Sequence, residues 1–297
     1  MPSYRYFALI ALLSIMIAGA LLYWSFLLSQ KTTLRISTTT SLYATGLLDA
    51  LADSFKKKYP NVILQFIAVG SGEALRKASM GDADVVLVHA PGLEKEYIEK
   101  SVISERRIFA YNYFVIVGPK DDPAGIAGLD PLSAMIKIYE VGGKGLAKFI
   151  SRGDNSGTHQ RELMLWAKVG LRPKGKPWYV ETGSGMSQTL LVANEMKAYT
   201  LSDIGTYLKL RDKLKELKVL VTYSEILLNI YSAYVVTSSE KKELARKFVE
   251  YLVSEGAQSL IENFGLKECG QPLFYPASSK SLDELRSAWE KLSKSDP

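Results

Sequence analysis

The segment Ser151-Arg152-Gly153-Asp154-Asn155-Ser156-Gly157-Thr158 follows a short apolar run, residues 147–150, and precedes a helical pattern that continues to about Val169. Small, glycine and hydroxyl-bearing residues therefore stand between a predicted strand and the start of a predicted helix. The first N–H groups of a helix lack intrahelical partners and carry a partial positive charge, which suits an oxyanion. Arg152 adds a planar guanidinium that can donate two hydrogen bonds to the same anion.

Two further loops have the same character. Residues 37–41, Ser-Thr-Thr-Thr-Ser, follow the predicted strand 34–36, and Gly70-Ser71-Gly72 follows the predicted strand 62–69. Taken singly, such a loop is more often an ordinary Ser/Thr helix cap than a binding site. Three of them follow strands, and ligands of open α/β sheets gather at the carboxyl ends of strands. Together they favour a site for an oxyanion.

The candidate binding residues in these three loops each offer a hydroxyl, a backbone N–H or a guanidinium group: Thr39, Thr40, Ser41, Ser71, Arg152, Ser156, Gly157 and Thr158. A second group contains Ser184, in a glycine-rich turn, and Tyr199, at the start of a strand-to-helix segment; each can equally be no more than part of a helix cap. Two histidines and the single cysteine, Cys269, are too few for a transition-metal site or a disulfide framework. We therefore expect no metal and no cofactor besides the ligand itself.

The rest of the chain alternates short β-branched or aromatic runs with helical patterns, which indicates an α/β fold with mainly parallel sheets. The chain has 297 residues, and 297 minus the first 30 leaves 267. A domain of that size is close to the point at which one hydrophobic core divides, so we expect two lobes. The turn-rich segment 118–125 is the candidate crossing between them.

Residues 7–28 form an apolar stretch of 22 residues without a charge, long enough as a helix to cross the roughly 30 Å hydrocarbon core of a bilayer. A cleaved secretory signal is the alternative, but no small-x-small cleavage site ends the stretch. We therefore expect residues 1–31 to hold an uncleaved, single-pass transmembrane helix. The positive-inside rule places Arg5 in the cytoplasm and the rest of the chain outside the cell membrane.

The charge is modest and spread along the chain. Lys and Arg number 37 against 31 Asp and Glu, a net charge of +6, and the densest basic run is Lys56-Lys57-Lys58. Nucleic-acid-binding proteins usually show a concentrated basic face with aromatic residues between the charges. We therefore expect no nucleic-acid partner.

Several segments, in this order, resemble the tungstate-binding component of Tup-type ABC importers, within the phosphate- and molybdate-like family of periplasmic solute-binding proteins. They are residues 38–41, 68–75, 81–85, 111–112, 151–159, 198–203 and 205–208. The resemblance covers roughly residues 34–236, and its Thr-Thr-Thr-Ser and Ser-Arg-Gly-Asp segments are specific when found together.

The resemblance implies a two-lobed type II periplasmic-binding-protein fold whose lobes close over the ligand. The first lobe would hold residues 34–117 and 223–297, and the second lobe residues 118–222. The resemblance also implies that tungstate is delivered to an ABC transporter permease driven by an ATPase. The residues that it assigns to the oxyanion are Ser41, Ser71, Arg152 and Ser156-Gly157-Thr158.

Two kinds of alternative stay open. Molybdate, phosphate and sulfate are ligands of the same class, and molybdate is so like tungstate in size and charge that only the resemblance favours tungstate. A Ser/His hydrolase would use Ser156 as nucleophile, His159 as base and Asp154 as orienting group. The sequence has no Gly-x-Ser-x-Gly elbow, and side chains three residues apart on a helix point along it. We therefore expect a binding protein and not an enzyme.

The resemblance also concerns His89, which follows the predicted strand 85–88. In the phosphate-binding relatives, an aspartate at the matching position accepts a hydrogen bond from the proton of hydrogen phosphate. An imidazole does not repel a bare dianion and can donate to it, so His89 would favour tungstate or molybdate over phosphate. The other interpretation is a histidine packed at the end of a strand without ligand contact.

Overall fold

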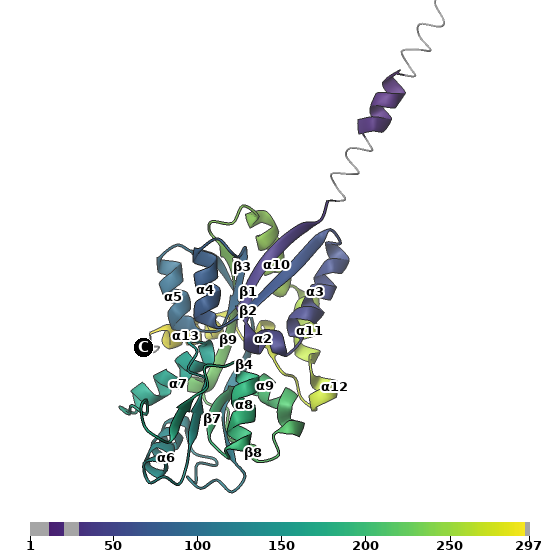
Figure 1. Cartoon of the computed structure of the whole chain (residues 1–297). Helices are drawn as coiled ribbons and strands as arrows, with labels where there is room; N and C mark the ends of the chain where they lie inside the picture. Colours follow the sequence, from purple (N-terminus) through teal and green to yellow (C-terminus); the bar gives the residue numbers. More distant parts are fainter. Residues whose placement is uncertain (1–11, 21–29, 295–297) are drawn as a thin grey trace, which may run out of the picture.

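The computed structural model describes residues 12–20 and 30–294. Residues 30–294 form two lobes, one above the other (Figure 1). The upper body in this view is the first lobe, and the lower body is the second lobe. One long strand, β4 (Ile103–Pro119), runs through both and joins them.

The sheet of the first lobe contains the N-terminal strands and the returning C-terminal part of the chain. Besides β4, its strands are β1 (Thr32–Thr39), β2 (Val62–Val69), β3 (Val85–Val88), β9 (Leu228–Val236) and β10 (Tyr275–Pro276). Their order is β10-β4-β9-β3-β1-β2. β1 runs parallel to both β2 and β3, so the loops that follow these three strands lie at one edge of the sheet.

The sheets are mixed, so the prediction of mainly parallel sheets is wrong. β9 runs antiparallel to β3 and to β4, and β10 also runs antiparallel to β4. The reason is that the chain leaves the first lobe along β4, passes through the second lobe and returns along β9 in the opposite direction. A sequence that alternates strands with helices does not reveal this return.

Helices cover the two faces of the first-lobe sheet (Figure 1). They are α2 (Thr40–Ala44), α3 (Leu47–Lys58), α4 (Ser71–Ser79), α5 (Pro91–Glu99), α10 (Lys242–Leu252), α11 (Glu255–Asn263), α12 (Leu266–Cys269) and α13 (Leu282–Ser293), with a 3-10 turn η3 (Ala277–Ser279). The apolar positions of α3 face the core as their spacing predicts: Leu47, Leu48, Leu51 and Phe55 are fully buried.

The second lobe packs helices around short strands. Its elements are α6 (Pro131–Gly143), β5 (Phe149–Ser151), α7 (Gly157–Lys168), β6 (Tyr179–Glu181), α8 (Met186–Glu195), β7 (Thr200–Asp203), α9 (Ile204–Leu210), η1 (Arg211–Lys213), β8 (Leu217–Val221) and η2 (Glu225–Leu227). Its core is aromatic, with Phe149, Trp166 and Trp178 buried against one another. The strands β7 and β8 pair antiparallel with the end of β4.

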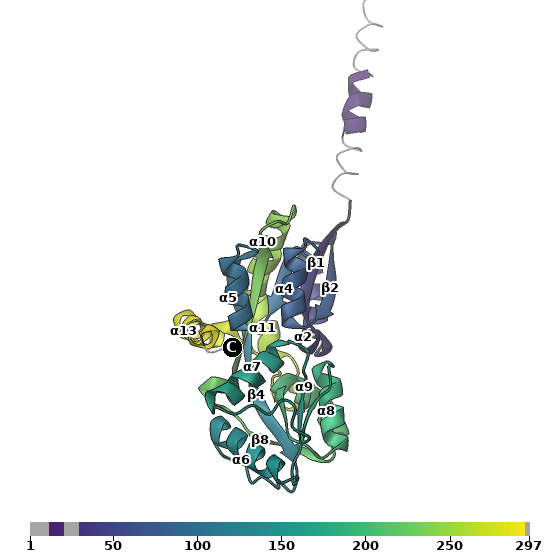
Figure 2. The same cartoon turned by 60° about the vertical axis from the view of Figure 1, so that its left-hand side comes forward.

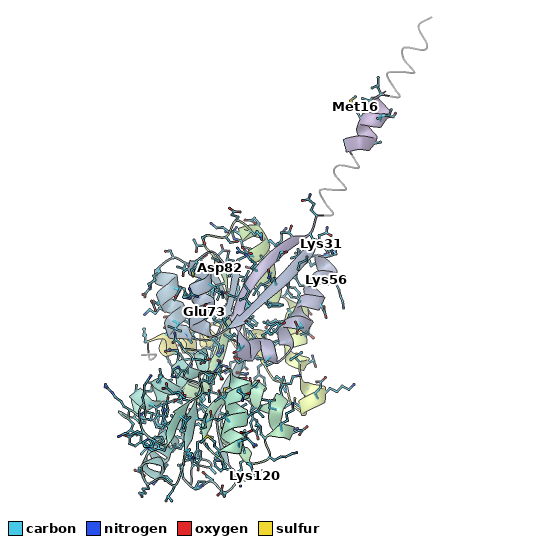
Figure 3. All side chains as sticks on the ribbon, viewed as in Figure 1. Met16, Lys31, Lys56, Glu73, Asp82 and Lys120 are labelled. Atoms are coloured by element: carbon cyan, nitrogen blue, oxygen red, sulfur yellow. The ribbon has the colours of Figure 1, made fainter. Side chains whose placement is uncertain are left out.

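The chain crosses between the lobes within β4. Residues 103–113 of this strand pair with β9, whereas residues 114–119 pair with β7 and β8. The crossing expected at 118–125 is therefore misplaced, because the strand enters the second lobe without a turn. The turn-rich segment instead lies at the far end of that lobe, where Figure 3 labels Lys120 opposite to Lys31.

The N-terminal apolar segment is described only at residues 12–20, which form a helix. Within the described ranges, 12–20 and 30–294, no helix has both the length and the apolar character needed to cross a membrane. The other residues of the predicted membrane segment 7–28 lie outside the described part of the chain.

The topology brings the three predicted loops to the place where the lobes meet. The loops after β1 and β2 open α2 and α4 at the lower edge of the first lobe, and the loop after β5 opens α7 at the upper edge of the second. Figure 2, like Figure 1, shows α2 directly above α8 of the second lobe. Side chains at these helix starts can therefore reach one ligand from both lobes.

Candidate functional site

Helix N-termini from both lobes form the frame of the site. Thr39 caps α2, because its Oγ1 accepts a hydrogen bond from the Leu42 N–H at 3.3 Å. Ser156 caps α7 in the same way, accepting from the His159 N–H at 3.3 Å. Ser71 is the first residue of α4. Capping at Thr39 and Ser156 does not exclude a ligand, because each cap satisfies only one of the free N–H groups at a helix start.

Arg152 is a buried cation at the centre of this frame, with a side chain only 2% exposed. Its Nη2 atom donates to Asp154 Oδ2 at 2.5 Å and to Thr40 Oγ1 at 3.3 Å. Its Nε and Nη1 atoms are buried and have no hydrogen-bond partner among the described residues. A buried N–H without an acceptor costs free energy, so these two donors mark a position that suits an anion.

Unpaired hydroxyl groups belong to the same loops. Ser71 Oγ and Thr158 Oγ1 are buried and, within residues 12–20 and 30–294, find no hydrogen-bond partner. The same holds for Thr38 Oγ1, which precedes the capping residue of α2. Hydroxyl groups rotate freely and can each donate to an oxygen atom, so they complement the guanidinium donors of Arg152.

The two lobes are in contact around these groups. The Gly72 N–H of the first lobe donates to the Asn155 carbonyl of the second at 3.4 Å. A Cβ atom at Gly157 would lie 2.7 Å from the His89 carbonyl oxygen and 2.8 Å from its ring, closer than any real side chain can approach. Only glycine at 157 allows α7 to begin this close to the end of β3. The structure is therefore a closed arrangement of the lobes.

His89 ends a chain of buried side-chain amides behind the site. The Asn112 Nδ2 atom donates to the Leu273 carbonyl at 3.2 Å, and Asn229 Nδ2 donates to Asn112 Oδ1 at 2.9 Å. The Oδ1 atom of Asn229 lies 2.9 Å from His89 Nδ1. On its other side, His89 Nε2 lies 3.4 Å from Ser41 Oγ.

The chain of amides decides where the His89 proton lies. The Leu273 carbonyl can only accept, which orients the amide of Asn112 and, through it, that of Asn229. Asn229 thus presents an oxygen to His89 Nδ1, and Nδ1 must carry the proton. In the neutral ring Nε2 is then an acceptor, so the expectation that the imidazole donates to the ligand does not follow from this arrangement.

His89 is neutral in this environment. Burial lowers its pKa to about 3, and the positive charges of Arg152 and Arg161 act in the same direction, while the hydrogen bond to Asn229 and the charge of Asp154 oppose them. The ring lies against those of Tyr231 and Phe114, with centroids 4.9 and 6.1 Å away.

Comparison with known proteins agrees with this architecture. The model of the PBP superfamily domain matches residues 29–256. The tungstate-binding protein TupA of Peptoclostridium acidaminophilum is 40% identical over 257 residues, which are 84% of this chain and 87% of the relative. The chain belongs to the TupA family of the PBP superfamily. This identification confirms the resemblance found in the sequence.

Two solved structures are similar to this chain over most of their length. The tungstate-binding protein TupA of Desulfovibrio alaskensis G20 is 42% identical, with a TM-score of 0.69, and the match covers 82% of this chain and 98% of that one. The tungstate ABC transporter structure from Geobacter sulfurreducens is also 42% identical with a TM-score of 0.69, covering 78% and 98% of the two chains. This chain therefore has the α/β periplasmic-binding-protein fold.

Most of the predicted site residues lie at the contact between the lobes. Each of these residues stands at a helix start beside the contact, makes a hydrogen bond there or packs closely against it. They are Thr39, Thr40, Ser41, Ser71, Arg152, Ser156, Gly157, Thr158 and His89. Ser184 instead donates to the carbonyl of Thr182 within its own turn. The Tyr199 hydroxyl donates to Asp122 at 2.8 Å and accepts from the Ala124 N–H, so the turn-rich segment 118–125 holds it.

The arrangement does not assemble a hydrolase. Ser156 Oγ is hydrogen-bonded to the backbone of His159 and not to its ring, and His159 Nδ1 accepts from the Asn155 N–H at 3.1 Å. Asp154 holds Arg152 and the Ser156 N–H instead of orienting an imidazole. In the described ranges no group of three His, Cys, Asp or Glu side chains could hold a metal ion.

Sequence reasoning missed three features of the candidate site. Thr38 has a buried, unpaired hydroxyl, but the candidate residues of its loop began only at Thr39. Asp154 holds the guanidinium of Arg152, and Asn112 with Asn229 fixes the tautomer of His89. The available signal was an asparagine inside an otherwise apolar strand, which usually requires a specific partner when buried.

Proposed function

We propose that this chain is an extracytoplasmic solute-binding protein that captures tungstate between its lobes and delivers it to an ABC transporter permease. The observation that carries the proposal is the pair of unpartnered donors on buried Arg152, together with the unpaired hydroxyls of Ser71 and Thr158. Tungstate is the ligand named for its relatives from P. acidaminophilum and D. alaskensis. Those relatives are binding proteins, which supports a binding function over an enzymatic one.

Ligand binding would drive closure. The donors of Arg152 and Thr158 come from the second lobe, and those of Ser71 and the α2 start come from the first. An anion satisfies both sets only when the lobes are together, so its binding energy favours the closed state over the open one. We propose the expected lobes, 34–117 with 223–297 and 118–222, with the first boundary moved to the hinge where β4 changes partners near Phe114, and with a second hinge where the chain returns at 222–228.

The proposed ligand set contains Thr39, Thr40, Ser41, Ser71, Arg152, Ser156, Gly157 and Thr158. Its members are donors or backbone N–H groups, and Asp154, the nearby carboxylate, is held by Arg152 at 2.5 Å. A site of this composition suits an anion without a proton, such as tungstate or molybdate. Sulfate carries the same charge but is smaller, so a rigid cradle would leave some donors unpaired.

We further propose that residues 7–28 form an uncleaved membrane anchor with the binding domain outside the cytoplasm. The support is the sequence itself, which has 22 residues without a charge in this stretch. The relatives named as ABC transporter components support a permease partner near the membrane.

Calorimetric titration of the full chain with tungstate, molybdate, sulfate and phosphate tests the proposal. We expect tungstate to bind at least as tightly as molybdate and far more tightly than sulfate or phosphate. Tighter binding of phosphate or sulfate than of tungstate would contradict the proposed ligand. Failure of all four anions to bind would contradict an oxyanion site.

A further inference from the structure

The hydroxyl of Ser41 lies between two acceptors once an anion is bound. On one side is the lone pair of His89 Nε2, 3.4 Å from Ser41 Oγ. On the other side the proposed function places the anion, because Ser41 belongs to the proposed ligand set. Ser41 has a single hydroxyl proton and cannot donate to both.

A dianion is the stronger acceptor, because hydrogen bonds to charged groups are shorter and stronger than those to neutral ones. The Ser41 proton would therefore turn to the anion. His89 Nε2 would then face a lone pair of Ser41 Oγ. Both atoms belong to buried side chains, and His89 is only 1% exposed, so water does not offer a simple replacement.

We propose that a proton resolves this conflict: binding of an oxyanion that carries no proton is accompanied by uptake of one proton at His89 Nε2. The imidazolium then donates from Nε2 to Ser41 Oγ, and Ser41 donates to the anion. Nδ1 keeps its hydrogen bond to Asn229 throughout. This inference rests on the proposed function, because it takes the ligand to be a fully deprotonated dianion.

The charges that act on the ring agree with such a change. Burial is the main cause that lowers the pKa of His89, and the charges of Arg152 and Arg161 act in the same direction. The hydrogen bond to Asn229 and the charge of Asp154 favour protonation but do not outweigh them. β9 and β4 contribute the neutral side chains of Tyr231 and Phe114. A dianion in the site adds two negative charges at short range, which favour the protonated ring. The ligand therefore supplies the condition under which His89 can hold a second proton.

Glu162 on α7 is the competing proton acceptor and must be separated from His89. It is buried in the second lobe, and burial raises its pKa to about 7. A dianion bound near the start of α7 would also favour its protonated form. Proton uptake by itself is thus insufficient, and its location has to be measured.

The first experiment counts protons. The full chain is titrated with sodium tungstate by calorimetry at one pH in two buffers that differ in ionisation enthalpy. We expect an uptake close to one proton per anion bound. The ligand-free ring has a pKa of about 3 and holds no second proton at neutral pH. By linkage, the affinity should then fall by up to about tenfold per pH unit from neutral pH up to the raised pKa of the ring in the complex. Tungstate binding without proton uptake would overturn the inference and leave the proposed function intact.

Two matched variants locate the proton. His89→Gln replaces the ring by an amide that does not titrate, and it should abolish the uptake. Glu162→Gln keeps an oxygen for the hydroxyl of Tyr179 and the indole of Trp166, and it should leave the uptake in place. The opposite pattern would assign the proton to Glu162 and overturn the inference.

A spectroscopic measurement does not depend on either variant folding. The chain has only two histidines, so nitrogen NMR of the ¹⁵N-histidine-labelled parent protein shows two rings, and His159→Gln assigns them. We expect His89 to be the neutral Nδ1–H tautomer without ligand and an imidazolium with saturating tungstate. A ring that stays neutral in the tungstate complex would overturn the inference, whereas absence of tungstate binding would overturn the proposed function as well.

Discussion

Arg152 of the second lobe donates through Nη2 to Thr40 Oγ1 of the first lobe at 3.3 Å, while its Nε and Nη1 atoms have no partner among the described residues. One guanidinium thus links the lobes and keeps two donors for a ligand. We predict that Arg152→Ala weakens tungstate binding at least about tenfold, because hydrogen bonds to charged groups contribute about 1.5–3 kcal/mol each. Arg152→Lys should retain only part of the affinity for tungstate, since an ammonium lacks the planar arrangement of donors that a guanidinium has.

Calorimetric titration measures both variants, and Arg172→Ala is the control. Arg172 is an exposed arginine of the same lobe, so its removal changes the net charge equally without touching the site. We expect the affinity of Arg172→Ala for tungstate to stay within about twofold of that of the parent protein. Parent-like tungstate binding by Arg152→Ala would remove Arg152 from the site.

Glu162 should make the stability depend on pH. Its Oε1 accepts from the Tyr179 hydroxyl at 2.6 Å and from the Trp166 indole, and burial raises its pKa from 4.5 to about 7. The folded protein therefore holds a proton that the unfolded chain has released between these two values. We predict that the free energy of unfolding falls by roughly 3 kcal/mol as the pH rises through this window, and that Glu162 adds no further dependence above it.

Urea unfolding at several pH values, compared between the parent and Glu162→Gln, isolates this contribution. The glutamine variant carries no ionisable group at 162, so its curve should be flatter across the window. If the two proteins lose stability in parallel as the pH rises, the pH dependence comes from other groups.

The start of α7 was predictable because its signals are local. Glycine and hydroxyl residues after a strand predict a helix N-terminus, and α7 begins at Gly157 with Ser156 as its cap. Its end was equally readable, since Gly170, with φ +69°, takes the left-handed conformation that glycine permits just past the last residue, Lys168. Each feature needs only residues within one or two turns.

The tautomer of His89 could not be predicted, because it depends on residues far apart in the chain. Asn229 and Asn112 are separated by 117 positions, and their orientation comes from the carbonyl of Leu273. The passage of β4 through both lobes was hidden for the same reason. A strand's partners are set by the fold as a whole, and the continuous apolar or aromatic run 113–117 covers only part of β4.

The membrane segment leads to a prediction about the mature protein. An uncleaved anchor leaves residues N-terminal to Gln30 attached to the binding domain. We predict that mass spectrometry of protein from the membrane fraction detects peptides from this region, including Arg5. A mature N-terminus near Lys31 would instead identify the segment as a cleaved signal.

Replacing Gly72 by alanine should affect the stability of the ligand-free protein and its binding of tungstate in opposite directions. It is the second residue of α4, where alanine is the better helix former by up to about 1 kcal/mol. A Cβ at this position would lie 2.6 Å from Asn155 Nδ2 and 3.3 Å from the Asn155 carbonyl oxygen, across the contact between the lobes. The amide of Asn155 cannot move freely, because its Oδ1 accepts a hydrogen bond from Gln160. We therefore predict that Gly72→Ala leaves the melting temperature of the ligand-free protein unchanged or higher, yet weakens tungstate binding several-fold by opposing closure.

Gly256→Ala is the matched control, since Gly256 is the second residue of α11 and a Cβ there would meet nothing within 4 Å. X-ray scattering should show the parent contracting with saturating tungstate and Gly72→Ala needing more tungstate for the same contraction. If Gly72→Ala and Gly256→Ala bind tungstate equally well, the contact between Gly72 and Asn155 has no part in closing the lobes over the ligand.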